Sequence, residues 1–235
     1  TQDQVCGVKL VAATVVSEAV DAGEFESQVA IASGAAGTVT IIITSLEQTI
    51  SCATRVPGTL SDYESAAAKA QFRAGVADAL GVELSSVSEL TIADARRRRR
   101  LQDSTVTISY DVVLTDPTAA ATAAAVAKDT TTFTQALVQA VNDAGGGGVV
   151  LDASEVTVEP PTINTAIEYE IIIATADTTV VSGVQEQLQD TSVMAAALSA
   201  VTGTTVLASE IESTVAQPPT HLEPESDPTS ESSVV

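Results

Sequence analysis

The sequence has very few aromatic side chains: no tryptophan, three tyrosines and three phenylalanines among 235 residues. Exposed aromatic rings are the usual platforms on which nucleic-acid bases stack, and sugar-binding surfaces use them in the same way. We therefore expect no stacking surface of this kind. The hydrophobic residues, 45% of the chain, are almost all Ala, Val, Ile and Leu, and this share argues against disorder throughout.

Basic residues are also scarce, because ten Lys and Arg stand against 31 Asp and Glu, for a formal net charge of −21. Such a surface repels phosphate, so nucleic acid is not an expected partner. Half of the basic charge lies in one run: Arg96, Arg97, Arg98, Arg99 and Arg100. Three interpretations stay open: a solvated loop neutralised by nearby carboxylates, a contact with an acidic surface of a neighbouring copy, or a cleavage site for a processing protease.

The sequence offers few candidate catalytic residues. The only histidine, His221, lies among Pro, Glu and Ser near the C-terminus, so a Ser-His-Asp or Cys-His arrangement is not expected. The glycines 145–148 follow a predicted helix and precede a predicted strand, which is the wrong order for a phosphate loop. We predict no enzyme activity, no catalytic residue, no cofactor and no dedicated metal site, although so acidic a surface leaves room for loosely bound calcium.

Cysteine is limited to Cys6 and Cys52, whose spacing fits neither a zinc site, a CxxC redox pair nor a haem attachment. We favour one disulfide between them over two buried free thiols, because the rest of the chain is typical of a secreted protein. The longest apolar runs, 41–43 and 171–174, fall far short of the ~20 residues of a membrane helix. No basic segment precedes an apolar one at the start, so any signal peptide is expected to be already removed.

Strand-like segments recur along the chain, and this repetition is the most informative feature of the sequence. Each copy alternates apolar and polar residues and so has one apolar face. The opening strands are predicted from two matches: Thr38–Ile41 with Thr105–Ile108, and Ile108–Val112 with Ile167–Ile171. The closing strands are predicted at Ser88–Ile92 and Ser154–Val158, with weaker copies at Ser27–Ile31 and Ser209–Ile211.

Ala-rich segments between these strands carry apolar residues four apart, which predicts helices with one buried face. The apolar sets are Phe72, Val76 and Leu80; Phe133, Leu137 and Val141; Met194 and Leu198. Phe72, Phe133 and Met194 occupy equivalent places, so we interpret them as one core anchor per unit rather than as a cofactor pocket. Asp62 and Asp129 are predicted N-caps, and Gly81 and the glycines 145–148 are predicted helix ends.

The chain therefore divides into three strand-helix-strand units, at about 38–94, 105–160 and 165–216, after a partial unit at 1–37. Residues 8–23 of the partial unit are predicted as a helix, with a β-branched strand over 8–16 as the alternative. Two such units side by side form a four-stranded sheet covered by helices, the ferredoxin-like plan. The predicted fold class is α+β, with tandem units and largely antiparallel sheets.

The first two units make a predicted domain at 38–160, and the third unit at 161–217 needs a partner. It pairs either with the partial unit of the same chain or with that of a neighbouring molecule, and the second arrangement builds a head-to-tail filament. Residues 218–235, with Pro, Ser and Thr between four acids, have the composition of an extended acidic tail.

One combination of motifs resembles a known family. It consists of Phe72-x3-Val76-x3-Leu80-Gly81-Val82, Ser88 to Ile92, the arginine run with Leu101-Gln102, and Val106 to Val112. The pattern resembles the SEA-like, ferredoxin-like repeat modules of secreted or surface proteins in algae and other protists. The resemblance covers residues 38–216 and implies a building role without enzyme activity. Self-cleaving modules carry a serine after glycine, which Gly148-Val149-Val150-Leu151 lacks, so that activity is not implied.

The predicted function is that of a secreted structural protein, located outside the cell or at its surface. It assembles with copies of itself, as an oligomer or filament, or with other extracellular structural proteins of an appendage, wall or fibre. The disulfide would act as a staple, and residues 96–100 as a contact or processing site. The alternative is an extracellular adhesion module that binds glycans or cations.

Overall fold

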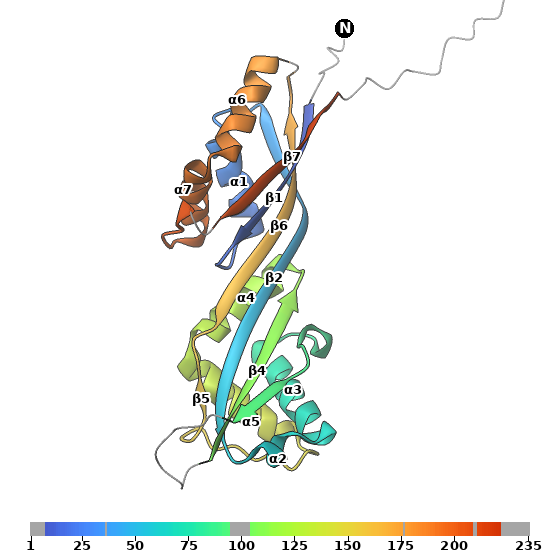
Figure 1. Cartoon of the computed structure of the whole chain (residues 1–235), viewed down its shortest axis with the longest axis vertical. Helices are drawn as coiled ribbons and strands as arrows, with labels where there is room; N and C mark the ends of the chain where they lie inside the picture. The colour runs from blue at the N-terminus through green and yellow to red at the C-terminus, as the bar shows by residue number, and fades with distance from the viewer. Residues whose placement is uncertain (1–7, 36, 95–103, 176, 209–210, 222–235) are drawn as a thin grey trace, which may run out of the picture. The chain divides into compact units, whose positions relative to one another are not determined.

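The computed structural model describes residues 8–35, 37–94, 104–175, 177–208 and 211–221. Figure 1 labels its helices and strands along the chain. The elements are β1 (Val8–Val16), α1 (Ala22–Ala32), β2 (Val39–Pro57), α2 (Leu60–Tyr63), α3 (Ala66–Leu80), the 3-10 turn η1 (Leu84–Ser86), β3 (Thr91–Asp94), β4 (Thr105–Leu114), α4 (Pro117–Lys128), α5 (Thr130–Ala144), β5 (Thr157–Val158), β6 (Thr162–Ile173), α6 (Thr178–Gln189), α7 (Thr191–Thr202) and β7 (Glu212–His221). The mixture of helices with an antiparallel sheet confirms the α+β class.

The chain forms two compact units, and three of its strands, β1, β2 and β6, contribute residues to both. The first unit contains residues 1–14, 23–44 and 168–235, and the second contains residues 15–22 and 45–167. The divisions at residues 14/15, 44/45 and 167/168 fall inside β1, β2 and β6. The boundaries predicted from the sequence at 37/38 and 160/161 instead lie between strands. The predicted acidic tail at 218–235 begins inside β7, so its residues 218–221 form the end of a strand, and residues 222–235 lie outside the described residues.

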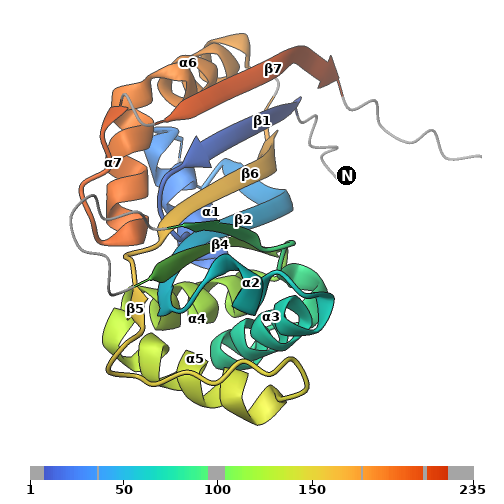
Figure 2. The ribbon, with the colours of Figure 1, turned by 60° about the horizontal axis from the view of Figure 1, so that its bottom comes forward.

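In the second unit, the strands are hydrogen-bonded in the order β3-β4-β2-β5. Each of these three pairings is antiparallel, and β2 and β4 pair over ten consecutive positions, from Gln48 with Leu114 to Pro57 with Thr105. Figure 2 shows α3, α4 and α5 together on one side of β2 and β4. The unit is therefore two layers, a sheet and a helical cover, with the core between them.

In the first unit, the strand order is β2-β6-β1-β7. Helix α1 lies between β1 and β2 in the chain, and α6 and α7 lie between β6 and β7. Strand β7 is at the edge of this order and contains Pro218 and Pro219. Proline is tolerated at an edge because it has no N–H to donate to a neighbouring strand.

Strand β2 changes the side that it buries part-way along its length. Val39 and Ile41 are buried before the change, and Leu46, Gln48 and Ile50 are buried after it. The alternation shifts by one residue where Thr44 and Ser45 are both exposed. Since successive side chains of a strand point to opposite faces, β2 buries one of its faces before residue 44 and the opposite face after residue 45.

Two predictions for the N-terminal segment are wrong. Residues 8–16 form strand β1 rather than the beginning of a helix, and its side chains alternate between buried and more exposed. The β-branched residues of this stretch, the basis of the alternative interpretation, favour an extended backbone. Ser27–Ile31, predicted as a closing strand, lies inside α1, where Phe25 and Val29 are buried one helical turn apart.

The residues interpreted as anchors are all fully buried. Phe72 of α3 and Phe133 of α5 belong to the core of the second unit, and the ring of Phe72 meets that of Tyr110 edge-on at 6.2 Å. In the first unit, Met194 is buried, and Phe25 and Tyr169 form an edge-on pair at 5.2 Å. Edge-to-face contact is the arrangement that aromatic rings favour, so each core contains one such pair.

Capping hydrogen bonds and a left-handed glycine mark the ends of several helices. Asp129 is the N-cap of α5 and accepts hydrogen bonds from the hydroxyl and the backbone N–H of Thr132, which hold its pKa below the usual value. Asp62 is not an N-cap: it lies inside α2, where its carboxylate accepts from the Thr59 N–H in a capping box. The helix that contains Phe72, α3, has Ser65 as its N-cap. Gly81 ends α3 in the left-handed conformation, as predicted.

The buried side chain of Gln71 holds the glycine run in place. Its amide nitrogen donates to the carbonyl oxygens of Val141 and Val149 at 2.8 and 2.7 Å. Its amide oxygen accepts from the backbone N–H groups of Gly147 and Val149 at 2.9 and 3.1 Å. One side chain thus satisfies four backbone groups, and the loop after α5 is bound to α3 rather than left as a flexible turn.

Gly183→Ala is expected to raise the free energy of unfolding by about 0.5–1 kcal/mol. Gly183 lies inside α6, and a Cβ added there meets no heavy atom within 4 Å. Alanine would restrict the unfolded chain and improve helix propensity without a steric cost. Chemical denaturation of the purified variant measures the gain, and a loss of stability would contradict the open surroundings of this glycine.

Candidate functional site

The helix-free face of the second unit's sheet is the candidate site. In the stretch of β2 that pairs with β4, and in β4 itself, the even-numbered residues are buried, among them Ile50, Val56, Ile108 and Val112. The odd-numbered residues of the paired stretch lie on the opposite face. Within the described part of the second unit, all its longer helices lie on the buried side (Figure 2).

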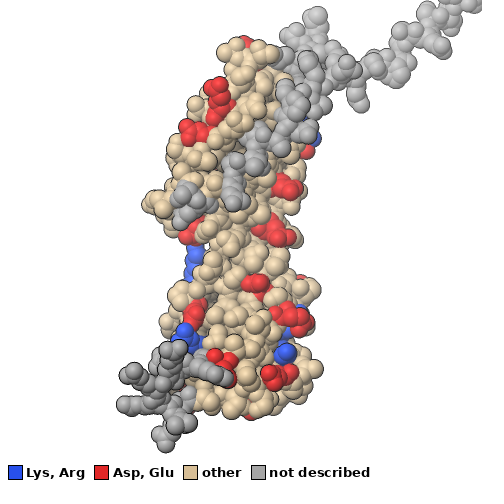
Figure 3. All heavy atoms as spheres, viewed as in Figure 1, with Lys and Arg blue, Asp and Glu red and all other residues tan. Residues whose placement is uncertain are grey.

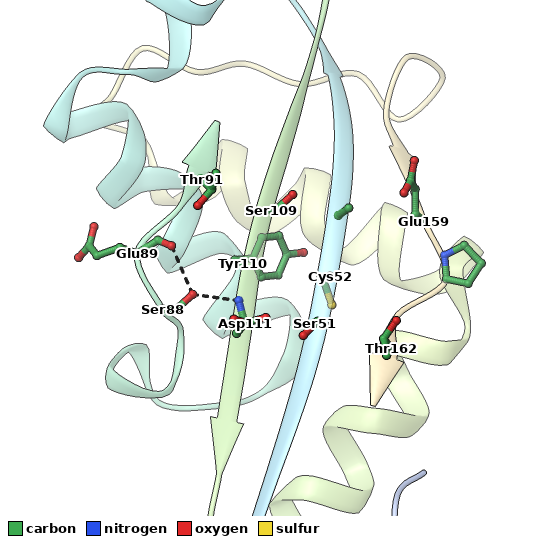
Figure 4. Close-up of a pocket in the computed structure, with 12 residues that line it drawn as sticks. Ser51, Cys52, Ser88, Glu89, Thr91, Ser109, Tyr110, Asp111, Glu159 and Thr162 are labelled. Carbon is green, nitrogen blue, oxygen red and sulfur yellow. Dashed lines mark hydrogen bonds between the residues drawn. The ribbon is translucent and has the colours of Figure 1, made fainter. Parts of the chain in front are cut away.

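A shallow hollow of about 350 Å³ lies on this unit and is lined mostly by small polar residues (Figure 4). Its hydroxyl groups come from four places in the chain, and three carboxylates stand among them. The Ser and Thr residues are Ser51, Ser88, Thr91, Ser109 and Thr162, and the acids are Glu89, Asp111 and Glu159.

Strand pairing arranges the outward residues in rows across the sheet. Ser109 of β4 pairs with Thr91 of β3 on one side and with Ala53 of β2 on the other. The next row places Arg55 of β2 opposite Thr107 of β4. Towards the other end of the strands, Ser51 pairs with Asp111. We call these outward residues of β2, β3 and β4 the open face.

The charges next to the open face are partly paired within the chain. Arg55 forms an ion pair with Glu159, although both side chains stay partly exposed. Glu89 accepts from Arg73 of α3 at 2.9 Å. Asp111 is exposed, and its backbone N–H donates to the hydroxyl of Ser88 at 2.9 Å, as Figure 4 shows. Arg55 and Asp111 therefore lie at opposite ends of the open face, with uncharged Ala53 and Ser109 between them.

Cys52 and Tyr110 lie beneath the open face rather than on it. Both are buried, and Tyr110 extends from β4 towards β2, where Thr54 lies 3.4 Å from its hydroxyl (Figure 4). Burial raises the pKa of the Cys52 thiol to about 12, and burial also raises the pKa of Tyr110. A thiol with such a pKa stays protonated at neutral pH and is a poor nucleophile.

No protein-family model, curated protein or solved structure matches this chain. Among the residues that the structure describes, no helix has both the length and the apolar character needed to cross a membrane. In the same residues, no group of three or more His, Cys, Asp and Glu side chains is placed to hold a metal ion.

The site residues predicted from the sequence do not gather at the open face. Residues 96–100 and Cys6 lie outside the described residues, and Cys52 has a free thiol here, so the disulfide stays a prediction. Phe72, Phe133 and Met194 lie in the cores. The open face itself was missed, although its signal was present: the polar positions of Ile108-Ser109-Tyr110-Asp111-Val112 alternate with the apolar ones.

Cys52 is expected to resist thiol reagents in the folded protein at pH 8, reacting at least about a hundredfold more slowly than in denaturant. Its pKa of about 12 leaves almost no thiolate at that pH. A Cys6→Ser variant assigns the labelling signal to Cys52, and rapid labelling of this folded variant would contradict the burial. In the unsubstituted protein, the absence of any labelling in denaturant without reductant would instead reveal the Cys6–Cys52 disulfide.

Proposed function

We propose that this chain is a structural module that assembles with copies of itself outside the cell. The observation that carries the proposal is the open face: a helix-free sheet surface with small side chains at its centre. Small, uncharged residues let a second surface approach closely without burying unpaired charge. An exposed surface of this kind suits a broad protein contact better than an enclosed reaction site.

We further propose that both units are ferredoxin-like domains. The second unit supports this with its antiparallel order β3-β4-β2-β5 and its helices between β2 and β3 and between β4 and β5. The first unit has the same kind of order, β2-β6-β1-β7, with helices in corresponding places. In this interpretation, the N-terminal segment and the third predicted unit complete each other within one chain.

The pairing of the N-terminal strand within its own chain limits how two copies can associate. Strand β1 already has β6 and β7 of the same chain as neighbours. A filament made by exchanging these strands between molecules would have to break those pairings first. We therefore propose contact between surfaces rather than exchange of strands, which keeps both cores intact.

The extracellular location, the SEA-like resemblance and the Cys6–Cys52 staple remain parts of this proposal. So do the two proposed roles of the arginine run, as an electrostatic contact or as a cleavage site. The chain is strongly acidic, and on the face visible in Figure 3 acidic side chains outnumber basic ones among the described residues. A basic segment of one copy would thus find acidic surface on another.

A glycan-binding or cation-binding module is the second candidate, and the lining of the hollow favours it. Five Ser and Thr residues and three acids line one depression of about 350 Å³. Hydroxyl and carboxylate groups can hydrogen-bond a sugar, and carboxylates are ligands for calcium. The open face lacks an exposed aromatic ring among its described residues, so a sugar would be held without stacking.

Sedimentation velocity of the full chain over a wide concentration range tests the main proposal. Self-assembly predicts species larger than the 23.9 kDa monomer that grow with concentration. The same runs with calcium chloride, together with retention on immobilised glycans, test the second candidate. A monomer at every concentration that is retained by a glycan would replace the first function with the second.

A further inference from the structure

We propose that two copies of this chain pack their open faces against each other around a twofold axis, with Arg55 of each copy facing Asp111 of the other. This inference rests on the proposed self-assembly and names the contact through which it occurs. The occupant of the open face is thus a second copy of the same chain. Three properties of the face carry the argument: its register, the size of its central side chains and its charge.

The register of β2 and β4 makes the two charges suitable for a reciprocal contact. Arg55 pairs with Thr107 and Asp111 pairs with Ser51, so the two charges lie on different strands and four residues apart along them. At about 3.3 Å per residue, this separation is roughly 13 Å along the sheet. The pair of Ala53 with Ser109 lies halfway between them.

A twofold axis that runs between the two faces, perpendicular to the line from Arg55 to Asp111, exchanges these two positions. Each Arg55 then meets the Asp111 of the second copy, and both contacts form at once, as an isologous interface requires. The centre of the interface falls on Ala53 and Ser109, the midpoint of that line. Their small side chains leave the space that close packing of two sheets needs.

The electrostatics favour this face for contact between copies. With a formal net charge of −21, two copies repel each other over most approaches. Asp111 and Arg55 stand at opposite ends of the open face, while Glu89 and Glu159 next to it are paired with Arg73 and Arg55, so the reciprocal arrangement sets unlike charges against each other. The Arg55 side chain is 47% exposed even in its ion pair with Glu159. A guanidinium has five N–H donors, so Arg55 can donate both to Glu159 of its own chain and to Asp111 of the second copy.

Apolar contact adds to the charge pairing. Val113 lies on the same face as Asp111, next to it along β4, and is 37% exposed. It pairs with Thr49 of β2 at the acidic end of the face. Burial of this side chain by the second copy would remove one of the exposed large hydrophobic residues of the described chain from water.

Charge reversal on the full-length protein tests the contact by sedimentation velocity. Arg55→Glu and Asp111→Arg are each expected to weaken dimerisation by about tenfold or more, because every dimer then faces like charges at both ends. The double variant restores opposite charges and is expected to recover most of the affinity. Ala53→Tyr places a bulky ring at the centre and is expected to weaken dimerisation without any change of charge.

Lys128→Glu is the matched control. Lys128 is also 47% exposed and also forms an ion pair, with Glu18 at 2.7 Å, but it lies on α4, in the helical layer. The variant changes the net charge as Arg55→Glu does and breaks a comparable pair, so it should leave dimerisation within about twofold of the original. Circular dichroism and thermal denaturation of every variant establish that the fold is kept.

The outcomes separate this inference from the proposed function. Weakening by both single variants, recovery in the double variant and no effect of Lys128→Glu would support the open-face dimer. If the protein assembles but Arg55→Glu and Asp111→Arg behave like Lys128→Glu, the inference is wrong, and self-assembly occurs through another surface. A protein that stays monomeric at every concentration overturns both.

Discussion

Gln71→Leu is expected to lower the free energy of unfolding by about 3–5 kcal/mol. Leucine has a similar size but cannot replace the hydrogen bonds that Gln71 makes with the backbone groups of Val141, Gly147 and Val149. Two carbonyl oxygens and two N–H groups would lose a partner in a buried place, and each such loss is costly. Urea denaturation, followed by circular dichroism, measures the effect.

Gln139→Leu is the control for this prediction. Gln139 lies on α5, like Val141, but its side chain is exposed. The same substitution there should change the stability by no more than about 0.5 kcal/mol. Equal effects at Gln71 and Gln139 would show that the glycine loop is not held by Gln71.

Gly75→Ala is expected to cost about 2–3 kcal/mol, even though alanine is the better helix former. Gly75 lies inside α3, which packs along α5. A Cβ at this position would lie 2.4 Å from Cγ2 of Val141 and within 2.8 Å of the backbone N and Cα of the same residue. The two helices would have to separate, because two of these three atoms belong to the backbone.

The comparison with Gly183→Ala isolates the cause of this effect. Both glycines lie inside helices, but only Gly75 faces a neighbouring backbone. The same substitution is therefore expected to destabilise the protein at one position and to stabilise it at the other. A gain of stability at Gly75 would contradict the close approach of α3 and α5.

Local patterns in the sequence were good guides to single elements. Apolar residues four apart predicted the helices that contain Phe72, Phe133 and Met194, and alternation predicted β4 and β6. These signals are reliable because a helix or strand with one buried face repeats its apolar residues at its own period. The same signals were weak in the partial unit, where residues 8–16 form a strand and residues 27–31 lie in a helix.

The candidate site was harder to predict. The polar positions of β4 were visible in the sequence, but nothing local shows that Ala53 pairs with Ser109, or that Arg55 and Asp111 lie on one face. Those relations join residues about 56 positions apart and depend on strand register. The role of Gln71 was hidden for the same reason, since its partners are at least 70 positions away.

By itself, the residue pattern determined the α+β class, the helices that contain the three anchors, several helix ends and the burial of those anchors, because each depends on neighbours within a few positions. Only the tertiary structure decided that the chain divides inside β1, β2 and β6. In β2, the division coincides with the one-residue shift at Thr44 and Ser45. Opposite faces of the strand are buried before and after this shift, although the strand looks continuous in the sequence. Long-range pairing also decided which polar residues share the open face, and no local preference encodes that choice.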